Sequence, residues 1–169
     1  SGDKQWTRQF GTSTSDDASG VAVDSSGNIY ITGGTQGGFG NYTNAGTWDI
    51  FLAKYNSNGV QQWVKQSGTS TEDNGNAVAI DFSDNIYITG RTFGDLDGQS
   101  NSFRQDIFLI KYNSSGTKLW TKLLGGGHQY ANEAALDIKI DSSDNIYLTG
   151  MTTGDLDGNT NANNNMGSN

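Results

Sequence analysis

Two stretches of this sequence carry oxygen-bearing side chains at the spacing of a calcium-binding loop. They read Gly-Asp-Leu-Asp-Gly-Gln-Ser-Asn over residues 94–101 and Gly-Asp-Leu-Asp-Gly-Asn-Thr-Asn over residues 154–161. Carboxylate and amide oxygens at alternate positions, followed by glycine, resemble the ligands of the first half of an EF-hand loop. The candidate calcium ligands are Asp95, Asp97, Asn101, Asp155, Asp157 and Asn161.

The same loops have a second interpretation. No glutamate closes them at the twelfth position, and Gly38 and Gly40 stand in the first copy where the aspartate pair would be. Asx-turns that cap a connection between strands are therefore the alternative to a calcium site of modest affinity. Calcium is the one cofactor that the sequence suggests, and the chain requires none.

A second group of candidates is aromatic. These side chains lie in long glycine-rich segments, where they are available to stack on a sugar or to contact a protein, although packing within the loops competes with that role. A third such segment contributes a histidine and a tyrosine. The candidate ligand-binding residues are Trp48, Tyr42, Phe39, Phe93, Phe103, His128 and Tyr130.

Catalytic chemistry has little support in the sequence. His128 is the single histidine, there is no cysteine, and no serine lies in a nucleophile-elbow context. A catalytic triad or a zinc site cannot be assembled from these residues. We therefore expect no enzyme.

The composition excludes several further classes. The 169 residues are 33% hydrophobic and carry 18 acidic against 10 basic side chains, a net charge of -8. An acidic chain with scattered bases is a poor match for nucleic acid, and its apolar runs are far shorter than the roughly 20 residues that span a bilayer. We expect neither nucleic-acid binding nor membrane insertion.

The chain repeats itself. Trp6, Trp63 and Trp120 are 57 residues apart, and the interval from Asp81 to Asp141 is 60 residues because the third unit carries three extra residues. Such self-similarity is typical of solenoids, propellers and other repeat architectures. One framework of short elements is therefore expected in each unit.

Within each unit, four short segments alternate or run apolar between Gly, Asn, Asp and Ser, which indicates strands and turns. Residues 29–32 recur as 86–89 and 146–149, and residues 49–55 recur as 106–112. Both faces of the 29–32 segment are bulky, as expected for a strand sandwiched between two neighbouring sheets.

Four antiparallel strands per unit, repeated in tandem, predict an all-β fold of β-propeller blades. About three blades are present, and a ring needs about four to eight, so we expect an incomplete ring. A fragment of a longer propeller chain or association into a homo-oligomer would complete it. The expected single repeat region, 1–169, comprises a lone strand at 5–10, blades at 21–67 and 78–124, a partial blade at 135–152 and an Asn-rich tail at 159–169.

The cycle Gly-Val-Ala-Val-Asp-Ser-Ser-Gly-Asn-Ile-Tyr-Ile-Thr-Gly over residues 20–33, followed by Asp-Ile-Phe-Leu-Ala-Lys-Tyr over 49–55 and by Trp63, resembles the bacterial SBBP β-propeller repeat family. The resemblance covers nearly the whole chain. It implies a secreted or cell-surface protein whose propeller mostly lacks an assigned reaction.

Our leading hypothesis is a non-enzymatic, extracellular or cell-surface module for binding or adhesion. It would contact a protein or glycan ligand through the acidic face on which the long loops lie. The alternatives are part of a carbohydrate-active enzyme whose catalytic residues lie in further blades, and a structural repeat that assembles chain to chain.

Overall fold

The computed structural model describes residues 2–127, 129–156 and 158–159. These residues form ten strands and no helix. The described part of the chain therefore has no helix long and apolar enough to cross a membrane. The strands are β1 (Asp16–Val23), β2 (Ile29–Thr35), β3 (Asp49–Tyr55), β4 (Gln61–Ser67), β5 (Asp73–Ile80), β6 (Ile86–Thr92), β7 (Asp106–Tyr112), β8 (Lys118–Leu124), β9 (Glu133–Ile140) and β10 (Ile146–Thr152).

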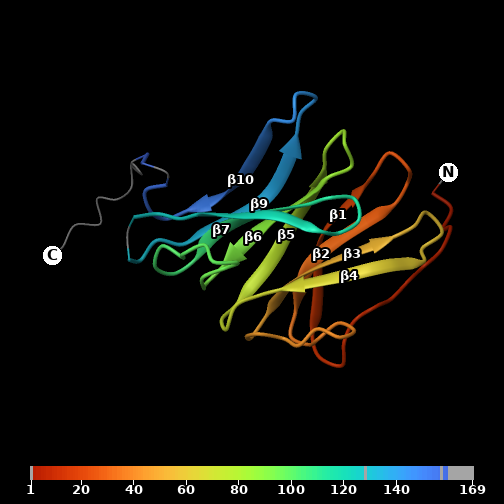
Figure 1. The fold of residues 1–169 in the computed structure, drawn as a ribbon, viewed down its shortest axis with the longest axis horizontal. Coiled ribbons are helices and arrows are strands. Elements are labelled where there is room, and N and C mark those ends of the chain that lie inside the picture. The colour runs from red at the N-terminus through yellow and green to blue at the C-terminus, as the bar shows by residue number, and fades with distance from the viewer. Residues whose placement is uncertain (1, 128, 157, 160–169) are drawn as a thin grey trace.

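The strands form three antiparallel sheets that follow the chain order. Blade 1 is β1-β2-β3-β4, blade 2 is β5-β6-β7-β8, and the third sheet is the pair β9-β10. Figure 1 shows the sheets fanned side by side, with blade 2 between the other two. The all-β fold of propeller blades is confirmed, and the described blades do not close into a ring.

The core includes two layers between the sheets and a further cluster on the outer face of blade 1, where Phe51 and Tyr55 pack against Phe10. Tyr30 and Leu52 of blade 1 pack with Ile88 and Ile110 of blade 2, and all four are at most 1% exposed. A matching layer joins blade 2 to the third sheet. Burying an aliphatic or aromatic side chain stabilises the fold by about 1.5–3 kcal/mol, so these layers hold the sheets together.

Small residues let the first strands of neighbouring blades approach closely. A Cβ on Gly20 of β1 would lie 2.9 Å from Cα of Ala77 in β5. No real side chain fits at that distance. The close contact of β1 with β5 therefore depends on glycine at this position.

The first strand of each unit begins earlier than its sequence predicts. β1 starts at Asp16 and β5 at Asp73, whereas the expected blades begin at residues 21 and 78. Each strand contains a β-bulge, between Ala18 and Gly20 in β1. Because a bulge inserts one residue, it reverses the inward and outward alternation, and this hides the first half of the strand from a pattern search.

Residues 5–10, expected as a strand, do not form one. A fourth strand pairs with the third strand of its own sheet, as β4 does with β3, and no described third strand is available to this segment. The segment instead lies along blade 1. The indole of Trp6 lies against Gly59, as the indole of Trp63 lies against Gly116 one unit later.

Candidate functional site

The long loops meet in a groove at the junction of blades 1 and 2. It has a volume of about 510 Å³, and an exposed aromatic ring and an exposed guanidinium group contribute to its walls. We call this surface the junction groove. Its lining residues are Thr47, Ser70, Thr71, Glu72, Phe93, Phe103 and Arg104.

Backbone hydrogen bonds within blade 2 and between blades 1 and 2 join the loops that line this groove. The amide of Thr47 donates to the carbonyl of Thr71 at 3.1 Å, and the amide of Asp73 donates to the carbonyl of Trp48 at 2.9 Å. The amide of Phe93 donates to the carbonyl of Glu72 at 3.1 Å. Three loops that are distant in sequence are therefore joined at the groove.

A buried aspartate stands below the groove. Its carboxylate accepts bonds from the Thr69 amide at 2.6 Å, from the Thr69 hydroxyl at 2.9 Å and from the Thr92 hydroxyl. Burial raises the pKa of Asp73 above its ordinary value, although these bonds oppose the shift. Since its oxygens are engaged within the fold, Asp73 orders the loops instead of facing a ligand.

The third sheet repeats this arrangement with two compensating changes. Glu133 stands in place of Asp73, and Gly126 stands where the other units have a threonine. A Cβ on Gly126 would lie 3.0 Å from Oε1 of Glu133, so the longer acid occupies the space of the lost side chain. Burial raises the pKa of Glu133 as well, while the Thr152 hydroxyl donates to it at 3.1 Å.

Charge in the groove is distributed unevenly. Arg91 donates to Glu72 at 2.7 Å, which satisfies the carboxylate in the groove wall. Arg104 is exposed and forms no ion pair with a described residue. The groove therefore presents a cation beside the Phe103 ring, which is 63% exposed.

The structure brings together some of the predicted ligand-binding residues. Phe93 and Phe103 both line the junction groove. The Trp48 carbonyl accepts the hydrogen bond from the Asp73 amide beside the groove, whereas the Trp48 ring lies against Gly34. Tyr42 and Tyr130 are exposed but are not among the groove's lining residues. His128 lies outside the described residues.

Phe39 requires a correction. Its ring is 6% exposed and packs 5.5 Å from Phe10 and 5.3 Å from Phe51, centroid to centroid. It is therefore a core residue, because the loop folds back over the blade and inserts the ring. Leu96, 57 residues later, is 1% exposed and does the same in blade 2. The 57-residue spacing between Phe39 and Leu96 indicates that both side chains pack in the core, and the sequence interpretation missed this signal.

The predicted calcium ligands have other partners in the described loops. Asp95 accepts a hydrogen bond from the Asn101 amide at 2.8 Å, as an Asx-type cap does. Asp97 forms an ion pair with Lys118 at 2.7 Å. Asp157 and Asn161 lie outside the described residues. Within the described part of the chain, no three His, Cys, Asp or Glu side chains cluster as metal ligands, and the calcium site stays a prediction.

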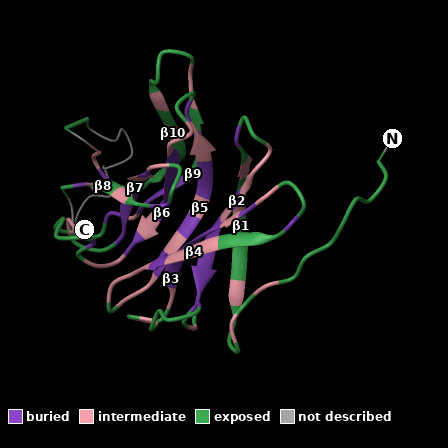
Figure 2. Ribbon diagram, turned by 45° about the vertical axis from the view of Figure 1, so that its right-hand side comes forward, coloured by how far each residue is buried: buried purple, intermediate pink, exposed green. Residues whose placement is uncertain are grey.

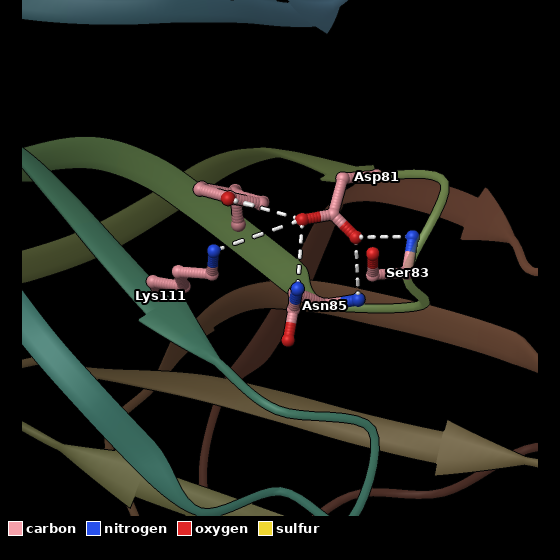
Figure 3. Close-up of polar contacts among 5 residues, drawn as sticks. Asp81, Ser83, Asn85 and Lys111 are labelled. Carbon is pink, nitrogen blue, oxygen red and sulfur yellow. Dashed lines mark hydrogen bonds and ion pairs between the residues drawn. The ribbon is translucent and has the colours of Figure 1, made fainter. Parts of the chain in front are cut away.

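A second polar cluster repeats at the opposite ends of the blades, in the turn between the first two strands. Asp81 accepts bonds from the amides of Ser83 and Asn85 at 2.9 and 2.8 Å and from the Tyr87 hydroxyl at 3.1 Å (Figure 3). Burial alone would raise the pKa of Asp81, but the hydrogen bonds outweigh it and the pKa lies below its ordinary value. Lys111 lies 3.7 Å from the same carboxylate.

Comparison with known proteins agrees with this architecture. A WD repeat-containing protein of Acanthamoeba polyphaga mimivirus, described as uncharacterized, is 32% identical over 59% of this chain. Regulatory protein FlaEY of Caulobacter vibrioides is 27% identical over 76% of this chain. The matches span 8% and 15% of those proteins, so this chain corresponds to a small part of each.

Two segments match the SBBP family, described as a beta-propeller repeat. Each match begins just before a Trp-containing segment and ends beyond the buried loop residue, Phe39 or Leu96. The second match starts in β4 of blade 1 and ends in the loop after β6 of blade 2, so the sequence repeat there runs from one blade into the next. This chain contains SBBP β-propeller repeats, matched at residues 5–40 and 62–97.

Proposed function

We propose that this chain is a non-enzymatic binding module whose ligand occupies the junction groove. The observation that carries the proposal is the pairing of an exposed ring, Phe103, with a cation, Arg104, that has no described ion-pair partner. Long loops on a rigid scaffold are the usual place for recognition. The hydrogen bonds that join the loops would hold the groove in shape before a ligand arrives.

The groove chemistry favours a ligand that bears a carboxylate, either an acidic glycan or a peptide segment. An aromatic ring can stack on a sugar or on an apolar side chain, and an arginine binds a carboxylate through two parallel hydrogen bonds. Hydroxyl groups of Thr47, Ser70 and Thr71 add further donors and acceptors.

A binding role agrees better with these residues than catalysis does. Asp73 and Glu133, two of the buried acids beside the loops, accept hydrogen bonds from the fold itself. An acid used for proton transfer must reach its substrate. Action outside the cell or at its surface belongs to the same proposal and rests on the family resemblance.

The test is binding of the 169-residue chain to arrays of neutral glycans, acidic glycans and peptides. We expect an acidic ligand to be retained, and we expect Phe103→Ala and Arg104→Ala each to weaken its binding about tenfold. Phe82→Ala is the matched control, because Phe82 is 78% exposed but lies in a turn at the opposite ends of the blades. Equal binding by all three variants would refute the proposal for this groove.

A further inference from the structure

The first strands of the three sheets end beside a small hollow. Figure 1 shows the turns that follow β1, β5 and β9 at the same end of the three sheets. The hollow has a volume of about 270 Å³, and the last residues of the three strands, Val23, Ile80 and Ile140, form its apolar part. We call this surface the turn hollow. Its lining residues are Val23, Asp24, Ser25, Ile80, Asp81, Phe82, Asp84 and Ile140.

Phe82 departs from the repeat at this hollow. The turns read Asp-Ser-Ser-Gly-Asn over residues 24–28 and Asp-Ser-Ser-Asp-Asn over 141–145, but Asp-Phe-Ser-Asp-Asn over 81–85. The Phe82 ring is 78% exposed. Figure 2 shows exposed residues at these turns, which extend beyond the buried strands of blade 2. A large apolar side chain therefore stands in water at a position where the other two units have serine.

The fold of the turn does not require this ring. Asp81 accepts hydrogen bonds from the amides two and four residues later at 2.9 and 2.8 Å, and Asp24 accepts the same pair at 3.0 and 2.8 Å. The same turn thus forms with serine in place of Phe82. Val23 of the same hollow is 59% exposed, so the ring is not an isolated apolar group. Exposed apolar surface rimmed by polar residues is typical of an interaction site.

The charged residues that line the turn hollow are all acidic. Three are aspartates, and no lysine or arginine is among them. Lys111 lies 3.7 Å from Asp81, whereas Asp24 and Asp84 form no ion pair with a described residue. Burial alone would raise the pKa of Asp24, but its hydrogen bonds outweigh burial and hold the pKa below its ordinary value. Asp24 is therefore ionised at neutral pH, and a cation complements the hollow.

Asp84 retains acceptor capacity for such a cation. The Ser25 hydroxyl is the one described donor to its carboxylate, and the distances of 3.3 and 3.4 Å are long for a bond between two oxygens. The carboxylates of Asp24 and Asp81 already accept bonds from their own turns. A metal ion needs several free oxygens at once, which the described residues of the hollow do not offer. An organic cation with an apolar stem fits these residues better.

We propose that the turn hollow binds an arginine side chain of a partner protein. The space of about 270 Å³ accommodates one side chain, whose methylene groups cover the apolar strand ends. Its guanidinium group stacks on the Phe82 ring and donates to the Asp84 carboxylate. Lysine fits less well, because its ammonium group is more strongly hydrated and has no flat face.

The charge of the whole chain supports a basic partner. The net charge of -8 attracts a basic segment from a distance, and the turn hollow offers it an apolar contact on arrival. The turn hollow lies at the opposite ends of the blades from the junction groove, and the two sites favour ligands of opposite charge. The proposal therefore does not depend on the junction groove.

The probe is a fluorescent peptide of glycine, leucine, arginine, leucine and glycine, titrated with the 169-residue chain and followed by anisotropy. We expect saturable binding that weakens as salt is added. A peptide with citrulline in place of arginine has nearly the same shape and no charge, and it should bind about tenfold more weakly, which corresponds to about 1.4 kcal/mol. This comparison requires no change in the chain, so misfolding cannot account for it. Equal affinity for the two peptides, or no saturable binding, would overturn the proposal.

Variants of the chain test the two contacts separately. Phe82→Ser restores the residue of the other two turns, so it should keep the urea midpoint of the parent and weaken binding of the arginine peptide about tenfold. Asp84→Asn should bind the arginine and citrulline peptides equally. Phe103→Ala removes an exposed ring of the junction groove and is the matched control, which should bind as the parent does.

Three results with the variants would overturn the proposal. Unchanged binding by Phe82→Ser would show that the ring makes no contact with the peptide. A large fall in the urea midpoint of Phe82→Ser would show that the ring stabilises the fold instead. If the parent chain formed a dimer that Phe82→Ser dissociated without peptide, a second copy would be the occupant of the hollow.

Discussion

The ammonium group of Lys111 lies 4.8 Å from the centre of the Tyr87 ring and 3.7 Å from the carboxylate of Asp81. One cation thus links the third strand of blade 2 to the turn that joins its first two strands. The hydrogen bond with Tyr87 and the nearby Asp81 charge keep the pKa of Lys111 above its ordinary value.

We expect Lys111→Met to lower the free energy of unfolding by about 1 kcal/mol, because the change removes a cation–π contact and an ion pair together. Urea denaturation measures this loss. Lys139→Met is the control, since the Lys139 side chain is 77% exposed, and it should change stability by less than about 0.5 kcal/mol. Equal effects of the two variants would contradict a structural role for Lys111.

The Asp81 carboxylate should make the protein less stable in acid. Its pKa in the folded chain lies below the ordinary value of 3.8, so the ionised form stabilises the fold above about pH 3.8. This contribution is lost as the pH falls through the lowered pKa. Asp81→Asn should therefore flatten the loss of stability between about pH 5 and about pH 3, measured as the urea midpoint.

Asp73 should affect the pH dependence of stability in the opposite direction to Asp81. Burial raises its pKa in the fold, so the stabilising contribution of the protonated form is present below 3.8 and is lost as the pH rises through the raised pKa. Asp73→Asn should steepen the net gain in stability on going from about pH 3 to about pH 6, because it removes an opposing contribution. If both aspartate variants changed the pH profile in the same direction, these assignments would be wrong.

Leu96 should be a core residue despite its place in a loop. Leu96 is 1% exposed, so Leu96→Ala should leave a cavity in the core. We expect the free energy of unfolding to fall by about 2–5 kcal/mol, measured by thermal or chemical denaturation. Phe103→Ala, in the same loop but at a ring that is 63% exposed, should cost less than about 0.5 kcal/mol. A small effect for Leu96→Ala would show that the loop does not pack on the blade in solution.

The turns between first and second strands contain a position in the left-handed region. Gly27 has a φ of 80°, and the equivalent Asp84 has a φ of 58°. Glycine adopts this conformation without a Cβ penalty. Asp84→Gly should therefore stabilise the chain by about 0.5–1 kcal/mol, and Gly27→Asp should destabilise it by a similar amount. Denaturation of the two variants in parallel checks the reciprocal signs.

The calcium proposal predicts competition with a lysine. Because Lys118 donates to Asp97 at 2.7 Å, the ammonium group must leave before Asp97 can bind a cation. We expect calorimetric titration with Ca²⁺ to give weak binding by the parent chain and tighter binding by Lys118→Gln. The double variant Asp97→Asn, Lys118→Gln should lose this gain, and an absence of heat in all three chains would reject the site.

The sequence by itself determined the repeating strands. The Ile-Tyr-Ile-Thr segments and the Asp-Ile-Phe-Leu segments alternate over a few residues, and β2, β3, β6, β7 and β10 form where those local patterns predict strands. The 57-residue interval also predicted the blades and the packing of both strand faces. The strands follow from alternation over a few residues, and the blades follow from the repeat of whole segments along the chain, and both can be found without knowing which residues touch.

The tertiary structure decided the features that join distant residues. The bulges displace the starts of β1 and β5, and residues 5–10 lack a third strand with which to pair. Packing of a loop on its own blade buries Phe39, and an ion pair within blade 2 holds Asp97 with Lys118. Contacts between blades bring residues of three loops into the junction groove. These contacts form only once the loops fold back on the sheets and the sheets stack, so a local pattern of residue types does not encode which side chains remain at the surface.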